Sequence, residues 1–225
     1  MSLKGRLVIR FVFSLVLGGA ILFIPAGSLK FWQGWVFLGI IFIPMLYASF
    51  YFYKRDPQLV ERRLETKEQI GEQRVIMGFA SVVFFGAFLL PGLDYRFGWS
   101  RATLPEPLWL TILAEGVVLA GYLMTYGVMY ANSYASRTIR VEENQKVISA
   151  GPYRIVRHPM YLGAVISMLF TPLALGSYWA VPAFLLIIPV IVLRILNEEK
   201  VLGQKLAGYP EYCLETRFRL FPFVW

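Results

Sequence analysis

One short stretch of the chain, Gly151–Gly163, gathers side chains that can do chemistry, in the order GPYRIVRHPMYLG. It contains His158, the only histidine, together with arginines and tyrosines. Its prolines and glycines predict a rigid, tightly turned backbone. Apolar sequence lies on both sides, and polar groups are costly to keep near hydrocarbon. A basic loop that only orients membrane helices needs no His-Pro or Gly-Pro-Tyr pattern, so we interpret this stretch, the motif, as functional.

A second polar group, Arg194, Glu198 and Glu199, lies at the end of the last long apolar block. Arg194 and Glu198 are four residues apart, so on a helix they share one face and can pair. Glu199 points about 100° away around the same helix. We expect both acids at a helix C-terminus, where carboxylates are unfavourable because that end carries partial negative charge. Their presence there indicates a role beyond solvation.

The ligand that best suits these groups carries both positive and negative charge. The stretch of the chain that follows these acids, called the tail below, adds aromatic and cationic side chains, namely Tyr209, Tyr212, Arg217 and Arg219. A phosphate-bearing nucleotide would match the arginines but leave the acids without a role, and the chain has no Rossmann or P-loop glycine pattern. S-adenosylmethionine is one ligand of this kind. Carboxylates can hold its ammonium or ribose diol, and the faces of Tyr153 or Tyr161 can attract its sulfonium.

The elements that must position these side chains are membrane helices. The chain has 225 residues, of which 57% are hydrophobic and only 16% are charged, and the apolar residues form long blocks. This composition predicts an all-α, polytopic transmembrane bundle with no room for a separate soluble domain. A single cysteine excludes an internal disulfide, and one cysteine with one histidine argues against a metal site.

The apolar blocks predict about six spans. We expect them at Leu7–Ala26, Phe31–Tyr53, Val75–Leu90, Leu108–Tyr130, Met160–Leu175 and Tyr178–Leu196. The first block could be a signal peptide, but it is long and lacks a suitable cleavage site, so we interpret it as a span. The last two form a helical hairpin around a turn at Gly176, and whether both cross the membrane completely stays open. The oligomeric state also stays open.

The basic residues predict how the bundle is oriented. The net charge of +8 would suit nucleic acid, but lysines and arginines lie at span ends, where they orient helices and meet anionic lipid. With six spans, only Lys30, Arg96 and Arg101 of the 22 fall on one side. The positive-inside rule therefore predicts that both termini and the motif are cytoplasmic in an integral membrane protein, and that nucleic acid is not a partner.

Two further polar features lie outside the motif. The segment Lys54–Arg74 starts a helix at Asp56-Pro57, with Asp56 as its cap, and its narrow apolar stripe fits either a membrane-surface helix or a solvated connecting helix. Glu115 lies inside the fourth span. We interpret it as a helix-packing acid, although a carboxylate in a span can also be functional.

The motif, followed by Glu198-Glu199 and then Gly208-Tyr209-x-x-Tyr212, resembles the isoprenylcysteine carboxyl methyltransferase and phospholipid methyltransferase superfamily. The resemblance covers Asn132–Pro222, and the first four spans show only a general likeness. It implies a four-span membrane region at 1–131 and a methyltransferase core at 132–225. In that core, the hairpin and tail form a non-Rossmann pocket for S-adenosylmethionine, which leaves as S-adenosylhomocysteine, and a lipidic methyl acceptor enters from the bilayer.

The resemblance also implies roles for single residues. Cofactor-binding positions are Val147, Ile148, Tyr153, His158, Pro159, Tyr161, Gly163, Glu198 and Glu199. Arg194 and Glu198 correspond to a pair near the acceptor and are the expected catalytic residues. A carboxylate acceptor needs no general base, and Arg194 could bind it through two hydrogen bonds. An amine or hydroxyl acceptor would need a base, with Glu198 or His158 as candidates.

Three functions therefore stay open, with carboxyl methylation of an isoprenylcysteine-type lipid as the first. The second is N-methylation of a phospholipid amine. The third is an NADPH-dependent reductase like the membrane sterol reductases, which share a similar C-terminal segment. Glu198 and Glu199 would repel the 2′-phosphate of NADPH, which argues against this third function. A non-enzymatic helper would be expected to lack His158, Tyr161 or the paired acids, and all of them are present.

Overall fold

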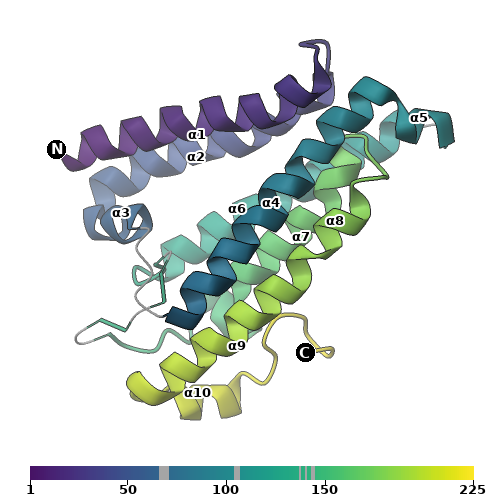
Figure 1. Cartoon of the computed structure of the whole chain (residues 1–225). Coiled ribbons are helices and arrows are strands. Elements are labelled where there is room, and N and C mark those ends of the chain that lie inside the picture. The colour runs from purple at the N-terminus through teal and green to yellow at the C-terminus, as the bar shows by residue number, and fades with distance from the viewer. Residues whose placement is uncertain (66–70, 104–106, 137, 140, 143–144) are drawn as a thin grey trace.

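The computed structural model describes residues 1–65, 71–103, 107–136, 138–139, 141–142 and 145–225, and every regular element in these ranges is a helix (Figure 1). The helices before the motif are α1 (Leu3–Ala26), α2 (Trp32–Arg55), α3 (Pro57–Leu64), α4 (Gly71–Phe97), α5 (Trp99–Thr103) and α6 (Leu108–Ala131). A 3-10 turn, η1 (Gly151–Arg154), follows within the motif. The remaining helices are α7 (Pro159–Ala174), α8 (Val181–Leu185), α9 (Ile187–Lys205) and α10 (Tyr209–Glu215).

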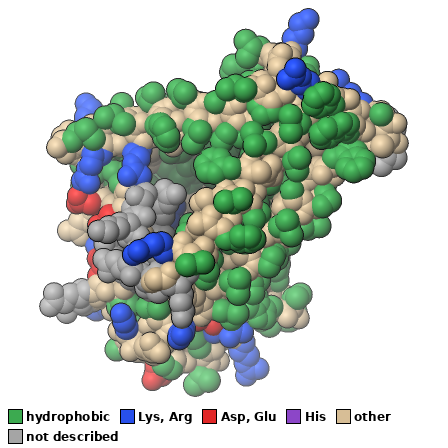
Figure 2. Space-filling model, viewed as in Figure 1, with side chains coloured by type: hydrophobic (Ala, Val, Ile, Leu, Met, Phe, Trp, Pro, Cys, Tyr) green, Lys and Arg blue, Asp and Glu red, His purple; other side chains and the backbone are tan. Residues whose placement is uncertain are grey.

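Five helical stretches are long and apolar enough to cross a membrane. They are α1, α2, most of α4, α6 and the run Val181–Lys205 that joins α8 to α9, while α7 is apolar but has only 16 residues. Hydrophobic side chains spread over the long helices, and lysines and arginines lie toward the ends of the molecule (Figure 2). The predicted polytopic helical bundle is confirmed. Among the described residues, five helical stretches meet the length of a span and the sixth, α7, is shorter.

The expected end of the third span at Leu90 is wrong, because α4 continues through Pro91 to Phe97. The reason lies in the packing against α1. A Cβ atom on Gly92 would lie 2.6 Å from the carbonyl oxygen of Leu22, so the missing side chain lets the two helices meet closely. Two residues further, the buried carboxylate of Asp94 accepts hydrogen bonds from Ser100 and Ser177. These contacts stabilise a helix end that proline alone would disfavour.

The expected helix end at Glu198 and Glu199 is also wrong. Helix α9 continues to Lys205, so both acids lie within the helix rather than at its C-terminus. The unfavourable helix-end charge therefore does not apply to them. Their partners on neighbouring elements, described below, explain them instead.

Helices α6 and α7 make the most extensive helix contact of the described bundle. Gly121 of α6 faces Gly163 of α7, where an added Cβ would lie 2.5 Å from the Gly121 carbonyl oxygen. Ser167, one turn further, donates to the Val118 carbonyl at 3.2 Å. Small residues allow this close approach, as in other membrane helix pairs. The contact fixes the position of α7 and therefore of the motif that precedes it.

The motif lies at one end of the bundle, together with α3 and α10, and we call this the motif end (Figure 1). Helix α5 lies at the opposite end. Pro159 is the first residue of α7, as expected from its fixed backbone angle, and His158 caps the helix through its backbone. Val147 and Ile148, two of the expected cofactor-binding positions, lie in a stretch that is neither helix nor strand.

Candidate functional site

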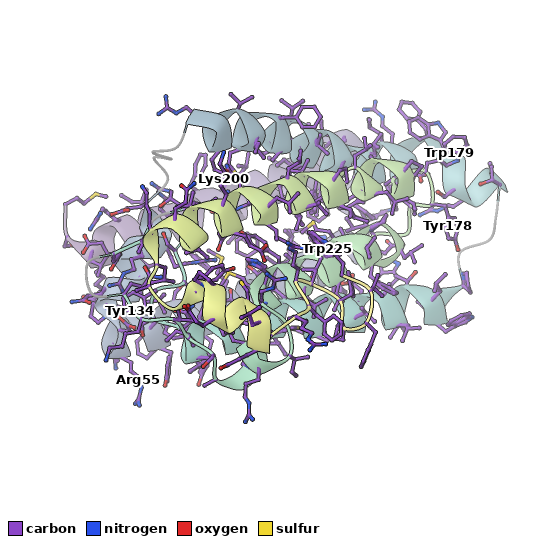
Figure 3. The ribbon with its side chains drawn as sticks, turned by 90° about the horizontal axis from the view of Figure 1, so that it is seen from below. Arg55, Tyr134, Tyr178, Trp179, Lys200 and Trp225 are labelled. Carbon is purple, nitrogen blue, oxygen red and sulfur yellow. The ribbon has the colours of Figure 1, made fainter. Side chains whose placement is uncertain are left out.

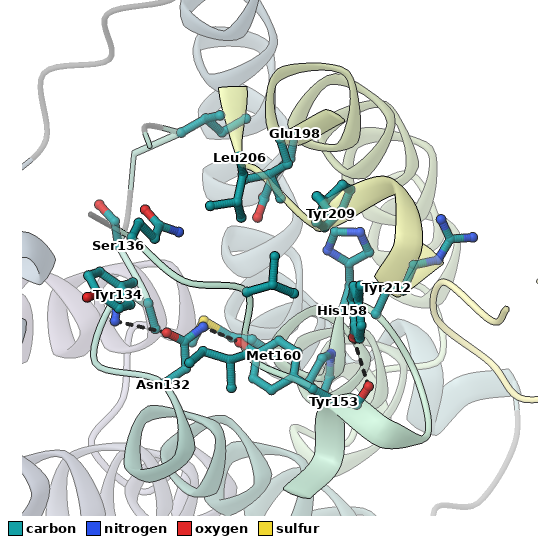
Figure 4. Close-up of a pocket in the computed structure, with 18 of the residues that line it drawn as sticks. Asn132, Tyr134, Ser136, Tyr153, His158, Met160, Glu198, Leu206, Tyr209 and Tyr212 are labelled. Carbon is teal, nitrogen blue, oxygen red and sulfur yellow. Dashed lines mark hydrogen bonds between the residues drawn. The ribbon is translucent and has the colours of Figure 1, made fainter. Parts of the chain in front are cut away.

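A cavity of about 900 Å³, its open mouth included, lies at the motif end. Its walls come from the segment after α6, the motif, α9 and α10 (Figure 4). Eight residues expected from the sequence line it: Val147, Ile148, Tyr153, His158, Pro159, Tyr161, Arg194 and Glu198. The fold therefore brings most of the expected site residues together, although they come from three separate parts of the chain.

Tyr161 joins the two expected catalytic residues. Arg194 Nε donates to the Tyr161 hydroxyl at 2.7 Å, and that hydroxyl donates to Glu198 Oε2 at 2.6 Å. Tyr161 comes from α7, whereas the other two lie one turn apart on α9. The expected pair is thus bridged by a third side chain, and the Arg194 guanidinium is held in one orientation at the cavity wall. On its other side, Nη1 lies 2.7 Å from the sulfur of Met77 in α4.

Glu199 does not line the cavity. Its carboxylate lies 3.0 Å from Arg157, 3.2 Å from the His158 ring and 2.8 Å from Arg219. Only 12% of this side chain is exposed, so the arginines offset the cost of burying its charge. Glu199 therefore connects α9 to the motif and to the tail. Its expected contact with a cofactor stays a prediction.

The tail packs against the motif and closes one side of the cavity. The backbone N–H groups of Arg157 and His158 donate to carbonyls of the tail at 2.8 and 2.9 Å. The Tyr212 hydroxyl donates to the Tyr153 carbonyl at 2.8 Å, and Asn132 donates to the Tyr153 hydroxyl at the same distance. Burial raises the pKa of Tyr153 and that of Tyr212 to about 12. Both hydroxyls are therefore protonated near neutral pH.

Residues 109–207 match the model of the phospholipid methyltransferase family. This part of the chain is therefore similar to a family of membrane methyltransferases. The match confirms the resemblance expected from the motif, and it spans α6, the motif and α7 to α9, which form most of the cavity wall.

The chain is also similar to two individual proteins. The cobalt-zinc-cadmium resistance protein CzcN of Cupriavidus metallidurans is 31% identical over 158 residues, which span 67% of this chain and 62% of that protein. The solved structure of a eukaryotic intramembrane Ras methyltransferase, ICMT (isoprenylcysteine carboxyl methyltransferase), is 17% identical and superposes with a TM-score of 0.52. That superposition covers 98% of this chain and 94% of the other, and it shows a shared fold.

Gly163 also lies outside the cavity lining, at the contact with α6 described above. A side chain there would meet the Gly121 carbonyl and, at 3.1 Å, the Thr125 hydroxyl oxygen. The absence of a side chain at Gly163 therefore allows α7 to approach α6 closely. Glu115 does not line the cavity either, because it is buried in α6. Neither of its carboxylate oxygens has a hydrogen-bond partner in the described part of the chain.

Several lining residues were not predicted as site residues. They include Asn132, Tyr134, Ser136, Thr138, Gln145, Met160, Leu202, Leu206, Tyr209 and Tyr212. For the five that follow α6, from Asn132 to Gln145, the sequence signal is only the polarity of that stretch. Its polar residues follow no period that would assign a side chain to a cavity. Tyr209 and Tyr212 are different, because both belong to the motif residues that carry the resemblance, and Tyr209 has a further distinguishing feature. Its buried hydroxyl has no hydrogen-bond partner among the described residues, and buried hydroxyls normally have one.

Proposed function

We propose that this protein transfers a methyl group from S-adenosylmethionine to a lipidic acceptor at the cytoplasmic face of a membrane. One observation carries the proposal: a cavity formed mostly by the family-matched segment is lined by Arg194, Tyr161 and Glu198, which are hydrogen-bonded in series. The cavity thus offers a cation that can bind an acceptor, together with a carboxylate and aromatic faces that can bind a cofactor. Carboxyl methylation of an isoprenylcysteine-type lipid is the first candidate reaction.

The residues of the cavity fit S-adenosylmethionine by their chemistry. Glu198 offers a carboxylate for an ammonium or a ribose diol, and the buried Tyr209 hydroxyl needs a hydrogen-bond partner. Tyrosine faces attract a sulfonium. We assign the cofactor contacts to Val147, Ile148, Tyr153, His158, Pro159, Tyr161, Glu198 and Tyr209. When bound, the cofactor supplies an electrophilic methyl group, and Glu199 and Gly163 act indirectly by holding the motif and α7.

Arg194 would bind and aim the acceptor. Its guanidinium can hold a carboxylate through two hydrogen bonds, and such an acceptor needs no general base. Tyr161 fixes the orientation of Arg194 in advance, so less freedom is lost when the acceptor arrives. The tail, hydrogen-bonded to the motif, limits the access of water to the reacting groups.

Phospholipid amine methylation is the second candidate, and the description of the matched family favours it. An amine acceptor must lose a proton, so it requires a base. Glu198 suits this role better than His158, because the His158 ring already interacts with Glu199. In this reaction Arg194 would instead contact the lipid phosphate.

The cofactor is tested by calorimetric titration of the purified protein with S-adenosylhomocysteine and, separately, with NADPH. We expect saturable binding of the first and none of the second. Binding of NADPH alone would instead support the reductase function.

The acceptor is tested by supplying isotopically labelled S-adenosylmethionine to membranes and analysing lipids and small prenylated thiols by mass spectrometry. A labelled methyl ester identifies a carboxylate acceptor, and a labelled N-methyl headgroup identifies an amine. If S-adenosylhomocysteine binds but no lipid or thiol gains the label, the proposed lipidic acceptor is wrong.

A further inference from the structure

Helix α3 lies against the outside of the cavity wall. This short helix, Pro57–Leu64, belongs to the connection between α2 and α4 and lies at the motif end (Figure 1). Arg62 Nε and Nη2 donate to the two carboxylate oxygens of Glu142 at 2.8 and 2.7 Å, and Nη1 donates to the Ser133 carbonyl at 2.9 Å. One guanidinium therefore holds two points of the segment 132–148.

That segment depends on such contacts for its position. Between the end of α6 and η1, its described residues form neither helix nor strand, so no regular backbone ladder fixes them. Yet Asn132, Tyr134, Gln145 and Val147 of this segment line the cavity. The Glu142 N–H also donates to the Gln145 side chain at 3.0 Å. The ion pair with Arg62 is thus connected directly to a residue of the cavity wall.

The apolar side of α3 makes a second attachment. Leu59 and Val60 are buried in a cluster with Met129 and Ala135, and Ala135 lines the cavity. A helix anchored in this way can act as a fixed support for its neighbour. The Arg62–Glu142 pair is also well shielded, with only 12% and 25% of the two side chains exposed. Bidentate pairs of this kind are stronger and geometrically more specific than single surface contacts.

We infer that α3 is a buttress for the cavity wall and that Arg62 is a positioning residue for cofactor binding. Arg62 does not line the cavity and acts through Glu142 and Ser133. The inference rests on the proposed function, because the cofactor is the ligand whose affinity reports the position of the wall. It assigns a role to the Lys54–Arg74 connection, in which 66–70 lie outside the described residues.

The test compares Arg62→Ala with a control that breaks an ion pair made by the neighbouring residue of α3, Glu61. Arg6→Ala breaks the ion pair between Arg6 and Glu61, which joins α1 to α3 at 2.6 Å but is far more exposed. We expect Arg62→Ala to weaken calorimetric binding of S-adenosylhomocysteine about tenfold, which corresponds to about 1.4 kcal/mol. Arg6→Ala should change it less than about twofold. At saturating cofactor, turnover of Arg62→Ala should stay near that of the wild type.

Two further measurements separate positioning from general destabilisation. Hydrogen exchange of the cofactor-free protein should become faster in 132–148 for Arg62→Ala, with little change in α7. Each single charge reversal, Arg62→Glu or Glu142→Arg, should weaken the binding of S-adenosylhomocysteine. The double variant that carries both reversals should bind it more tightly than either single variant, because the ion pair can form again. If Arg62→Ala does not fold, Arg62→Lys keeps the charge but cannot make the same fork, and it should give a smaller change in the same direction.

The outcomes distinguish this inference from the proposed function. Unchanged exchange in 132–148 together with unchanged cofactor affinity would overturn the buttress. Faster exchange spread evenly over the protein would overturn it as well, because that pattern reports global destabilisation. If the wild type binds no S-adenosylhomocysteine, the proposed function fails, and the exchange experiment still decides whether Arg62 holds the wall.

Discussion

At the scale of single residues, hydrogen-bond partners separate side chains that the sequence groups together. Glu198 and Glu199 are adjacent, but Glu198 faces the cavity and accepts from Tyr161, whereas Glu199 holds the motif and the tail. Their directions differ by about 100° because they are consecutive on a helix. We therefore expect substitutions of the two acids, and of the tyrosine between Arg194 and Glu198, to have different consequences.

Tyr161→Phe tests the bridge between Arg194 and Glu198. The variant keeps the ring but removes the hydroxyl that accepts from Arg194 and donates to Glu198. We expect turnover to fall about tenfold to a hundredfold, because Arg194 loses its fixed orientation, while S-adenosylhomocysteine binding changes less. Tyr178→Phe, at the opposite end of the molecule (Figure 3), is the control. A larger loss in cofactor affinity than in turnover would contradict the role given to Arg194.

Glu199→Gln tests the connection between α9, the motif and the tail. Removing the negative charge leaves Arg157 and Arg219 without their counter-ion, so both the thermal midpoint and the affinity for S-adenosylhomocysteine should fall. Scanning calorimetry and titration calorimetry measure the two effects. Glu211→Gln, on the exposed side of α10, should change neither. Unaltered affinity and midpoint in Glu199→Gln would show that this ion-pair cluster does not hold the site.

At the scale of elements, the close contact of α6 with α7 sets where the motif lies. Gly121 and Gly163 let the two backbones meet, and Ser167 adds a hydrogen bond across the contact. The motif leads directly into α7, so a shift of α7 would move His158 and Tyr161 together. A residue outside the cavity can therefore control the geometry of the site.

Gly163→Ala tests this control. Its Cβ would lie 2.5 Å from a backbone oxygen, so α7 must shift, and we expect a loss of about 1–3 kcal/mol in unfolding free energy with weaker cofactor binding. Gly127→Ala on α6 is the matched control, because an added Cβ there meets nothing within 4 Å. Thermal unfolding in detergent and calorimetric titration provide the measurements. Equal behaviour of the two variants would refute the packing role of Gly163.

At the scale of the whole molecule, charge divides the bundle into two ends. Arg55 and Lys200 lie toward the motif end, whereas Tyr178 and Trp179 mark the other end (Figure 3). The few cationic residues expected on the far side are Lys30, Arg96 and Arg101. This asymmetry matches the bias that orients membrane proteins during insertion. The proposed cytoplasmic position of the cavity depends on it.

The orientation is testable because the chain has one cysteine, Cys213. In a Cys213→Ser background, single cysteines replace the exposed Arg101 and Lys205. A membrane-impermeant maleimide added to intact cells should label Arg101→Cys and leave Lys205→Cys unlabelled until the membrane is opened. The reverse pattern would place the cavity on the outer face and exclude access to cytoplasmic cofactor.

Sequence patterns alone predict the class of the protein and most of the residues at its candidate site. Long apolar blocks report membrane helices directly, because hydrocarbon requires about 20 apolar residues in each span. The motif and the acids of α9 carry unusual residue types at fixed spacings, so Tyr153, His158, Tyr161 and Glu198 could be named before any geometry was known.

The contacts of these residues follow from how the folded chain packs. Local sequence rules predict that α4 ends at Leu90 and that α9 ends near Glu199. In the structure α4 continues to Phe97, where it packs against α1, and α9 continues to Lys205. The separate roles of Glu198 and Glu199, and the support that Arg62 provides through Glu142, arise from residues distant along the chain. Such contacts leave no periodic signal in the sequence, because they depend on how the helices meet.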